Sequence, residues 1–377
     1  MKRTFLPPRR ARLVLAAGAL LAGAASLSAH DFWLVPNAFV VAPGGDVVVR
    51  GQTSSRFPTS EAAVPPDRVA DARVVEASGS TPVRDLSAAG KSLRLAFRPS
   101  TPGQKLVALT TRSRTVRESA ESFRRYLELE GVPELVGRYQ REGKLPRDSV
   151  TRRYTKYAKT LVEVGTGGPR VFDRPVGHPV EFVPLGDPAA LRGGDTMVVR
   201  LLYRSRPLAG VRVHASGVPM EPGMDDAQAA ARAREVSVTT DAQGMVRVPV
   251  ESAGLWNVRT LHIVPADAGP GADWDAHWAT LVFGVGPAAT SHANGGAGAS
   301  ATSGTTARTD AQGDSAAVAR AVEQYHRALA AGDTAAVLRL LASDAVILES
   351  GGVETRAEYV SHHLPRDIAF ARAIRGE

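Results

Sequence analysis

The segment TDAQGMVRVPVESAGLWNVRTLHI (residues 240–263) decides the fold that the sequence predicts. It holds two β-branched runs, MVRVPVE and GLWNVRTLHI, and the turn signal DAQG precedes the first. Alternation along the second run places Trp256, Val258 and His262 on one face of a strand. Short alternating strands separated by turn residues favour an antiparallel β-sandwich.

The same pattern recurs on both sides of a basic central segment. Residues 38–111 contain the runs AFVVA, DVVVRG, RVADARVVEA, SLRLAF and QKLVALTT, and PGG between the first two predicts a hairpin. A second series extends from DTMVVRLLYRS to WATLVFGV. We therefore predict a mainly β chain with two antiparallel β-sandwich domains, at residues 30–185 and 186–286.

The central segment, at about residues 115–163, is predicted to be a helical insertion in the first sandwich. Phe123 and Tyr126 are three positions apart, as are Tyr154 and Tyr157, which is the spacing of one helical face. The segment is rich in Arg and Lys. This composition suits a helical face in water, and the alternative is a basic surface for an anion or a lipid headgroup.

Composition changes after the second sandwich. Residues 287–313 are rich in Gly, Ala, Ser and Thr, which predicts a flexible linker. Residues 314–377 then begin with the helix-like run DSAAVARAVEQYHRALAAGD, followed by TAAVLRLLAS and DAVILESGG. This tail is predicted to be a partial α+β domain.

The first 29 residues have the three parts of a secretory signal peptide. A basic start precedes the apolar run LVLAAGALLAGAA, and the small residues SLSA follow. Cleavage after Ala29 makes His30 the first residue of the mature chain, whereas cleavage after Ser28 leaves Ala29 first. The pair RR leaves twin-arginine export as the alternative to the general secretory route.

Export changes how the charge is interpreted. The formal charge of the chain is +8, and the signal peptide holds five of its basic residues, so the mature chain carries about +3. This balance gives little reason to expect a nucleic-acid partner. No other stretch is long and apolar enough to predict a membrane span. Cysteine is absent, which excludes disulfides and thiolate metal sites.

The mature start, HDFWLVPNAFVVAPGGDVVVRG, resembles a bacterial periplasmic family of unknown function, related to the periplasmic component of nickel/cobalt uptake systems. The resemblance continues in GHPVEFVPLGDP, PLAGVRVHA and DWDAHWATLVFGV and covers roughly residues 30–286. It implies two β-sandwiches, Ig-like or prealbumin-like, that handle a transition metal. Many members carry a His in the stretch that here reads GQTSSRFP, where this chain has Gln52.

The tail segment EQYHRALAAGDTAAVLRLLASDAVILESGGVETRAEYVSHHL is similar to the front of the SnoaL-like, nuclear-transport-factor-like cone fold. That family includes enzymes and binding modules, so an enzymatic role of the tail is left open. The side chains that would line such a pocket are Tyr325, His326, Asp344, Glu349, His362 and His363.

Three of the nine histidines are predicted metal ligands. His30 would offer its ring and, after cleavage, its α-amine. His262 ends the strand GLWNVRTLHI, and His277 lies beside Asp273 and Asp275. The alternatives are a capping residue, a core histidine and a polar loop, respectively. Imidazole and carboxylate ligands without thiolate suit nickel or cobalt, with copper or zinc as alternatives.

The sequence contains no nucleophile elbow, P-loop or dinucleotide-binding glycine motif. It therefore predicts a non-enzymatic, periplasmic protein that binds a transition-metal ion for uptake or buffering, with a membrane metal transporter as candidate partner. The alternative is a metal-free cell-envelope module whose sandwich edges bind a protein or a glycan.

Overall fold

The computed structural model describes residues 30–130, 132–144, 148–219, 224–267, 271–286, 320–321, 323–342, 345–349, 352–365 and 367–369. The chain divides into two units, residues 1–294 and 295–377, and each is described by itself. The predicted signal peptide (1–29) and linker (287–313) lie outside the described residues.

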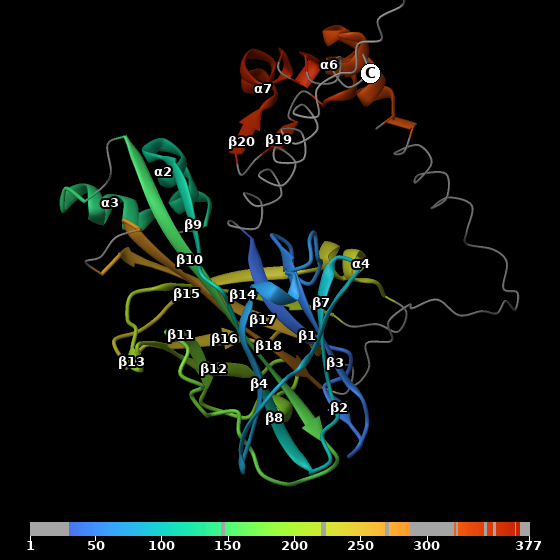
Figure 1. Cartoon of the computed structure of the whole chain (residues 1–377), viewed down its shortest axis with the longest axis vertical. Coiled ribbons are helices and arrows are strands. Elements are labelled where there is room, and N and C mark those ends of the chain that lie inside the picture. The colour runs from blue at the N-terminus through green and yellow to red at the C-terminus, as the bar shows by residue number, and fades with distance from the viewer. Residues whose placement is uncertain are drawn as a thin grey trace, which may run out of the picture. The chain divides into compact units, whose positions relative to one another are not determined.

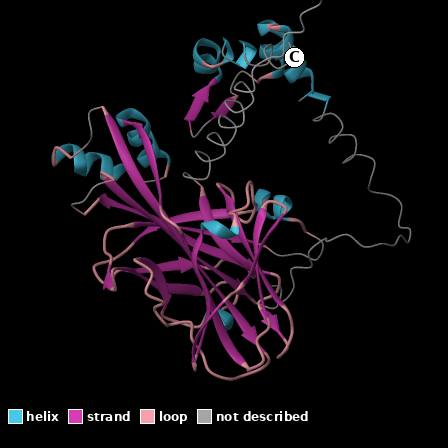
Figure 2. Ribbon diagram, in the orientation of Figure 1, coloured by secondary structure: helices cyan, strands magenta, loops and turns pink. Residues whose placement is uncertain are grey.

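Strands dominate the first unit (Figures 1 and 2). They are β1 (Asp31–Pro36), β2 (Val40–Val41), β3 (Val47–Ser54), β4 (Val69–Glu76), β5 (Gly79–Pro82), β6 (Asp85–Ala89), β7 (Ser92–Phe97), β8 (Gly103–Thr111), β9 (Arg114–Ser119), β10 (Ser149–Val164), β11 (Val180–Pro184), β12 (Thr196–Tyr203), β13 (Arg206–Pro207), β14 (Arg212–Val218), β15 (Arg234–Thr239), β16 (Met245–Pro249), β17 (Gly254–Pro265) and β18 (Trp274–Val285). The helices are η1 (Pro66–Arg68), α2 (Ala120–Leu129), α3 (Pro133–Arg141), η2 (Pro188–Ala190) and α4 (Asp226–Ala231).

One large sheet connects both halves of this unit. Its strand order is β15-β14-β17-β18-β10-β8-β4-β5, with β2 and β9 also paired to β10. The joint is a parallel ladder between β10 and β18, from Arg152 opposite Trp274 to Thr160 opposite Val282. The prediction of a mainly β chain with two sandwiches is confirmed. The parallel ladder makes the two sandwiches share one sheet, which the sequence does not predict.

The two sandwiches lie on opposite faces of the shared sheet. The sheet β1-β3-β7-β6 packs over β4, β8 and β10, and the sheet of β11, β12, β13 and β16 packs over β14, β17 and β18. Neighbouring residues of a strand point to opposite faces. Accordingly, Ala158 of β10 belongs to the first core and Tyr157 to the second. The predicted boundary after residue 185 is wrong because β11 pairs with β12 of the second sandwich.

The prediction of helix is confirmed for α2 and α3 and wrong for residues 149–163, which form the long strand β10. Tyr154 and Tyr157 are buried, but they point to opposite faces of β10 and serve two cores. A strand covered on both faces has no polar side, so its apolar spacing does not identify it as a strand. Residues 114–119 also differ from the prediction, because β9 pairs with β10.

The predicted hairpin of residues 38–51 is also wrong. The chain does turn there, with the Gly45 amide donating to the Ala42 carbonyl. However, β2 pairs in parallel with the end of β10, and β3 pairs with β1 and β7. The turn therefore connects two different sheets, which a local turn signal does not distinguish from a hairpin.

The described part of the second unit contains a helical run at residues 323–331, α6 (Thr334–Leu340), the hairpin β19 (Val346–Glu349) and β20 (Gly352–Thr355), and α7 (Arg356–His362). The Tyr325 and Tyr359 hydroxyls are 2.7 Å apart, and Tyr359 donates to Asp367. Asp344 and the side chains of Glu349 and His362 lie outside the described part. The SnoaL-like assignment stays a prediction.

Candidate functional site

Two of the predicted metal ligands, His262 and His277, are directly opposite each other on β17 and β18. Their ring centroids are 6.5 Å apart and the ring planes differ by 22°. The alternation predicted from sequence explains the side on which they lie. Trp256 and Val258 precede His262 on the same face and belong to the second core, so this histidine pair lies where that core ends.

Aromatic rings surround the histidine pair. The ring of Tyr203 makes an edge contact with His262 at 4.5 Å and lies 5.8 Å from His277. The Tyr157 hydroxyl is 3.2 Å from Nδ1 of His277. Burial, with a smaller contribution from the neighbouring His277, lowers the pKa of His262 to about 4. Burial likewise lowers the pKa of His277 to about 4, against the opposing effect of Asp275.

The second ring nitrogen of each histidine is buried without a partner. Among the described residues, Nε2 of His262 and Nε2 of His277 have no hydrogen-bond partner. They share this property with other buried atoms of the first unit, among them both ring nitrogens of His178. A buried polar atom left unsatisfied costs about 1–3 kcal/mol, and a water or an ion can satisfy it. A neutral imidazole nitrogen is also the usual histidine ligand of a transition metal. The two nitrogens are therefore candidate ligands of one ion.

The side chain of His277 has a defined orientation for such an ion. Metal-binding histidines usually engage their other ring nitrogen with an oxygen atom, which fixes the tautomer. Tyr157 supplies that oxygen at Nδ1. The two nearby carboxylates predicted as further ligands have other partners. Asp275 makes two hydrogen bonds with Arg153, at 2.6 and 2.8 Å, and Asp273 accepts from the Thr151 amide at 2.7 Å.

His30, the third predicted ligand, lies immediately before β1. Its Nε2 is 3.3 Å from the Glu61 carboxylate, and its carbonyl accepts from Lys156. Burial alone would raise the pKa of Glu61, but the Ser54 hydrogen bond and the charge of His30 lower it overall. An imidazole held by a carboxylate is a recurrent arrangement for a metal-binding histidine.

A cluster of charged residues, which sequence reasoning missed, follows His30. Asp31 is 4% exposed and pairs with Arg259 at 3.2 Å. Arg259 also pairs with Glu235 at 3.1 Å, and Glu235 binds His214 at 3.1 Å. We call Asp31, His214, Glu235 and Arg259 the charge cluster. No sequence motif indicates it, because its members come from four strands.

The structure divides the predicted three-histidine set. Arg259 is opposite Thr280 on β18, and Thr280 is three residues from His277, so the charge cluster and the histidine pair lie on opposite faces of the shared sheet. His30 precedes the cluster residue Asp31. Within the described residues, no group of three or more His, Asp or Glu side chains is arranged to hold one metal ion.

Gln52, which stands where many members of the resembled family have a His, is 1% exposed. Its Nε2 donates to Asp226 at 3.0 Å, at the first residue of α4, and Arg50 donates to the same carboxylate. Gln52 therefore helps to join β3 to α4.

Taken together, the fold and these contacts define a mainly β protein whose first unit has two sandwiches on one sheet, with a buried histidine pair. The chain belongs to the family described as "Domain of unknown function (DUF4198)", whose model matches residues 27–264. The relation to nickel/cobalt uptake stays a prediction. No curated protein matches the chain significantly.

Several solved structures match part of the chain at low sequence identity. A Salmonella α-2-macroglobulin mutant is 12% identical with a TM-score of 0.18, covering 68% of this chain and 15% of its own. The D0–D1 domain of intimin is 11% identical with a TM-score of 0.17, covering 68% of this chain and 98% of its own. A DUF4785 family protein from Legionella pneumophila is 8% identical with a TM-score of 0.18, covering 59% and 49%.

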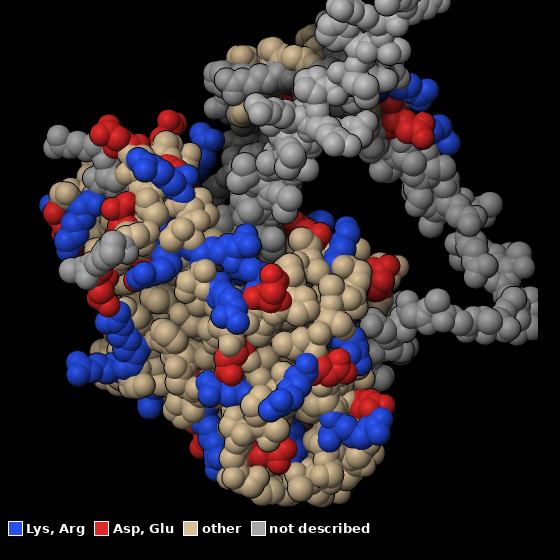
Figure 3. All heavy atoms as spheres, in the orientation of Figure 1, with Lys and Arg blue, Asp and Glu red and all other residues tan. Residues whose placement is uncertain are grey.

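On the face shown in Figure 3, acidic and basic side chains of the described residues are interspersed. Among the helices of the described segments, none has the length and apolar character needed to cross a bilayer.

Proposed function

We propose that this protein is exported and binds a divalent transition-metal ion, nickel or cobalt first, through the histidine pair. The observation that carries the proposal is the pair of facing imidazoles whose Nε2 atoms have no hydrogen-bond partner in the described chain. Imidazole suits nickel, cobalt, copper and zinc. Burial keeps both rings neutral at pH 7, so no proton has to leave before an ion binds.

A site with only two protein ligands fits uptake or buffering, because the ion can pass to another molecule. Two imidazoles leave the remaining coordination positions to water or to a donor from another molecule. An ion held in this way exchanges more readily than one held by four protein ligands, and a membrane transporter is the candidate acceptor. His30 provides a second, independent donor set on the other face of the sheet, if the signal peptidase cuts after Ala29. Its ring is already held by Glu61.

Calorimetric titration of the exported full-length chain with Ni²⁺, Co²⁺, Cu²⁺ and Zn²⁺ at pH 7.5 tests the proposal. Mass spectrometry first establishes whether His30 is the mature N-terminus. The variants are His262→Ala/His277→Ala, His30→Ala and, as control, His326→Ala, which changes an exposed histidine of the second unit. We expect the double variant to bind at least tenfold more weakly and the control to bind like the wild type.

The other outcomes are equally informative. Loss of binding in His30→Ala alone would move the site to the N-terminus and contradict the histidine pair. Absence of specific binding in the wild type would contradict metal binding altogether and favour the metal-free envelope module.

A further inference from the structure

A second potential site lies where the two sandwiches separate. The parallel ladder between β10 and β18 ends at Thr160 opposite Val282, and β10 then pairs with β2 and β8 instead. A cavity of about 580 Å³ opens beyond this point, lined by the ends of β10 and β18, by the start of β8, by η2 and by residues 165–170. Its volume lies within the range of small-molecule sites, which often form where domains meet.

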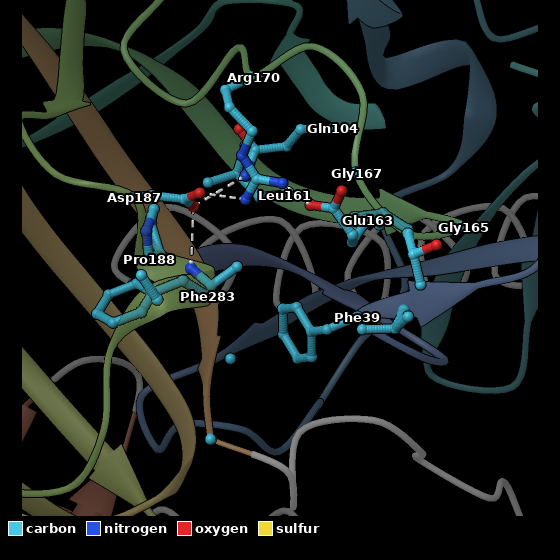
Figure 4. A pocket seen from close by; sticks show the side chains of 17 residues that line it. Phe39, Gln104, Leu161, Glu163, Gly165, Gly167, Arg170, Asp187, Pro188 and Phe283 are labelled. Carbon is cyan, nitrogen blue, oxygen red and sulfur yellow. Dashed lines mark hydrogen bonds and ion pairs between the residues drawn. The ribbon is translucent and has the colours of Figure 1, made fainter. Parts of the chain in front are cut away.

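The cavity has one charged side. Arg170 donates to Glu163 at 2.5 Å and pairs with Asp187 (Figure 4). We call Glu163, Arg170 and Asp187 the charged row. Gln104 donates to Asp187 at 3.2 Å and accepts from the Val171 amide at 3.1 Å, so it fixes one end of this row. Residues fixed in this way keep their orientation whether or not a ligand is present.

The remaining walls are largely apolar. Phe39, Leu161, Pro188 and Phe283 line the cavity, and Figure 4 shows the ring of Phe39 across from the charged row. These side chains come from both sandwiches, because Phe39 and Leu161 lie in the first and Pro188 and Phe283 in the second. A ligand with an apolar body would therefore contact both halves of the molecule.

The net charge of the charged row determines whether a cation or an anion binds more favourably. Two carboxylates, Glu163 and Asp187, face one guanidinium, so the row carries a net negative charge. Arg170 already uses a donor on each carboxylate, and an added anion would have to compete with both. In addition, Oε1 of Glu163 is buried without a hydrogen-bond partner in the described chain, and a donor from a ligand would satisfy it.

We propose that this cavity binds a small organic cation, a primary amine or guanidinium on an aromatic or branched aliphatic body. The cationic group would face Glu163, and the apolar body would lie against Phe39 and Val40. The proposal does not depend on the metal site, because none of its residues belongs to the histidine pair or to the charge cluster.

The test compares two probes of the same shape and opposite charge, phenethylamine and 3-phenylpropionate, by ligand-observed NMR and calorimetry at low salt. We expect the amine to bind at least tenfold more tightly than the carboxylate, and salt to weaken it. Equal binding, tighter binding of the carboxylate or no binding of the amine would overturn the proposal. This comparison uses the wild type and needs no variant.

Two variants then locate the bound amine. Glu163→Gln should reduce the preference for the amine at least fivefold. Ala189→Trp, at an exposed residue of the lining, should block the cavity and abolish binding. Its matched control is Leu185→Trp, which adds the same ring at an exposed residue outside the lining. Amine binding that survives Ala189→Trp, or is lost equally in the control, would contradict the assignment.

Discussion

Buried polar groups have different partners on the two faces of the shared sheet. On one face, the charge cluster pairs Asp31 with Arg259 and Arg259 with Glu235. On the other face, His262 and His277 are neutral, and their Nε2 atoms have no partner in the described chain. The ion pairs of the charge cluster account for its buried charges, although Oδ1 of Asp31 and Nε2 of His214 have no hydrogen-bond partner in the described chain. In the histidine pair, one ligand would satisfy two unpartnered nitrogens from directly opposite residues.

This difference between the two faces affects how substitutions change the free energy of unfolding. Removing one member of a partnered group leaves another buried and unpaired, which is costly. Removing an unpartnered nitrogen takes away a group that the metal-free protein does not use. The charge cluster should therefore be sensitive to substitution in stability measurements, and the histidine pair should be sensitive in binding measurements. The following expectations test this contrast in order of decreasing effect.

Arg259→Met should give the largest effect. It leaves the Asp31 carboxylate buried without its cation, and breaking a buried pair costs about 3–5 kcal/mol. Urea unfolding followed by tryptophan fluorescence measures the loss. The double variant Asp31→Asn/Arg259→Met should recover part of it. A loss below about 1 kcal/mol in the single variant would mean that the cluster is not partnered as described.

Acidification should destabilise the protein through His178. Burial, with smaller contributions from the nearby cations Lys159 and Arg73, lowers the pKa of this ring to about 3. The unfolded chain takes up a proton near pH 6.5 and the folded chain only near pH 3, so stability falls as the pH falls through this interval. His178→Gln should lose roughly 3 kcal/mol less between pH 6.5 and 4. Parallel pH profiles of variant and wild type would contradict this expectation.

Thr280→Val tests how firmly β1 is attached to the shared sheet. The Thr280 hydroxyl donates to the Phe32 carbonyl at 2.7 Å, and valine keeps the shape while removing the donor. Leaving the carbonyl unsatisfied should cost about 1–2 kcal/mol. Ser361→Ala, at an exposed position of the second unit, is the control and should unfold like the wild type. An unchanged midpoint in Thr280→Val would show that this contact does not matter.

His262→Phe should have the smallest effect on stability. The ring stays against Tyr203, and the nitrogen without a partner is removed, so the free energy of unfolding should change by less than about 1 kcal/mol in metal-free buffer. The same variant should lose the stabilisation that added Ni²⁺ gives the wild type. A loss above about 3 kcal/mol without metal would make His262 a structural residue.

Much of the fold could be predicted from the sequence, because alternation and turn residues are local signals. The face of His262 followed from Trp256 and Val258 in this way. The partners of a strand are not local. The turn after β2 looked like a hairpin, yet β2 pairs with β10, some 120 residues away. Likewise, β10 serves two cores, so its apolar residues occur at spacings that also fit a helix.

The candidate site was predicted in part for the same reason. His262 and His277 were each chosen for residue type and sequence context, and their direct opposition is a matter of strand register. Their separation from His30 depends on the side of the sheet on which each lies. The charge cluster and the Glu163–Arg170–Asp187 row combine residues from distant strands and loops. Their ordinary charged residues gave no signal in the sequence.

The most direct measurement is anomalous diffraction from crystals of the full-length protein grown with Ni²⁺ at pH 7.5. We expect one strong nickel peak within coordination distance of Nε2 of both His262 and His277. A peak at His30 alone, or hydrogen-bonded water at both Nε2 atoms with no nickel, would contradict it.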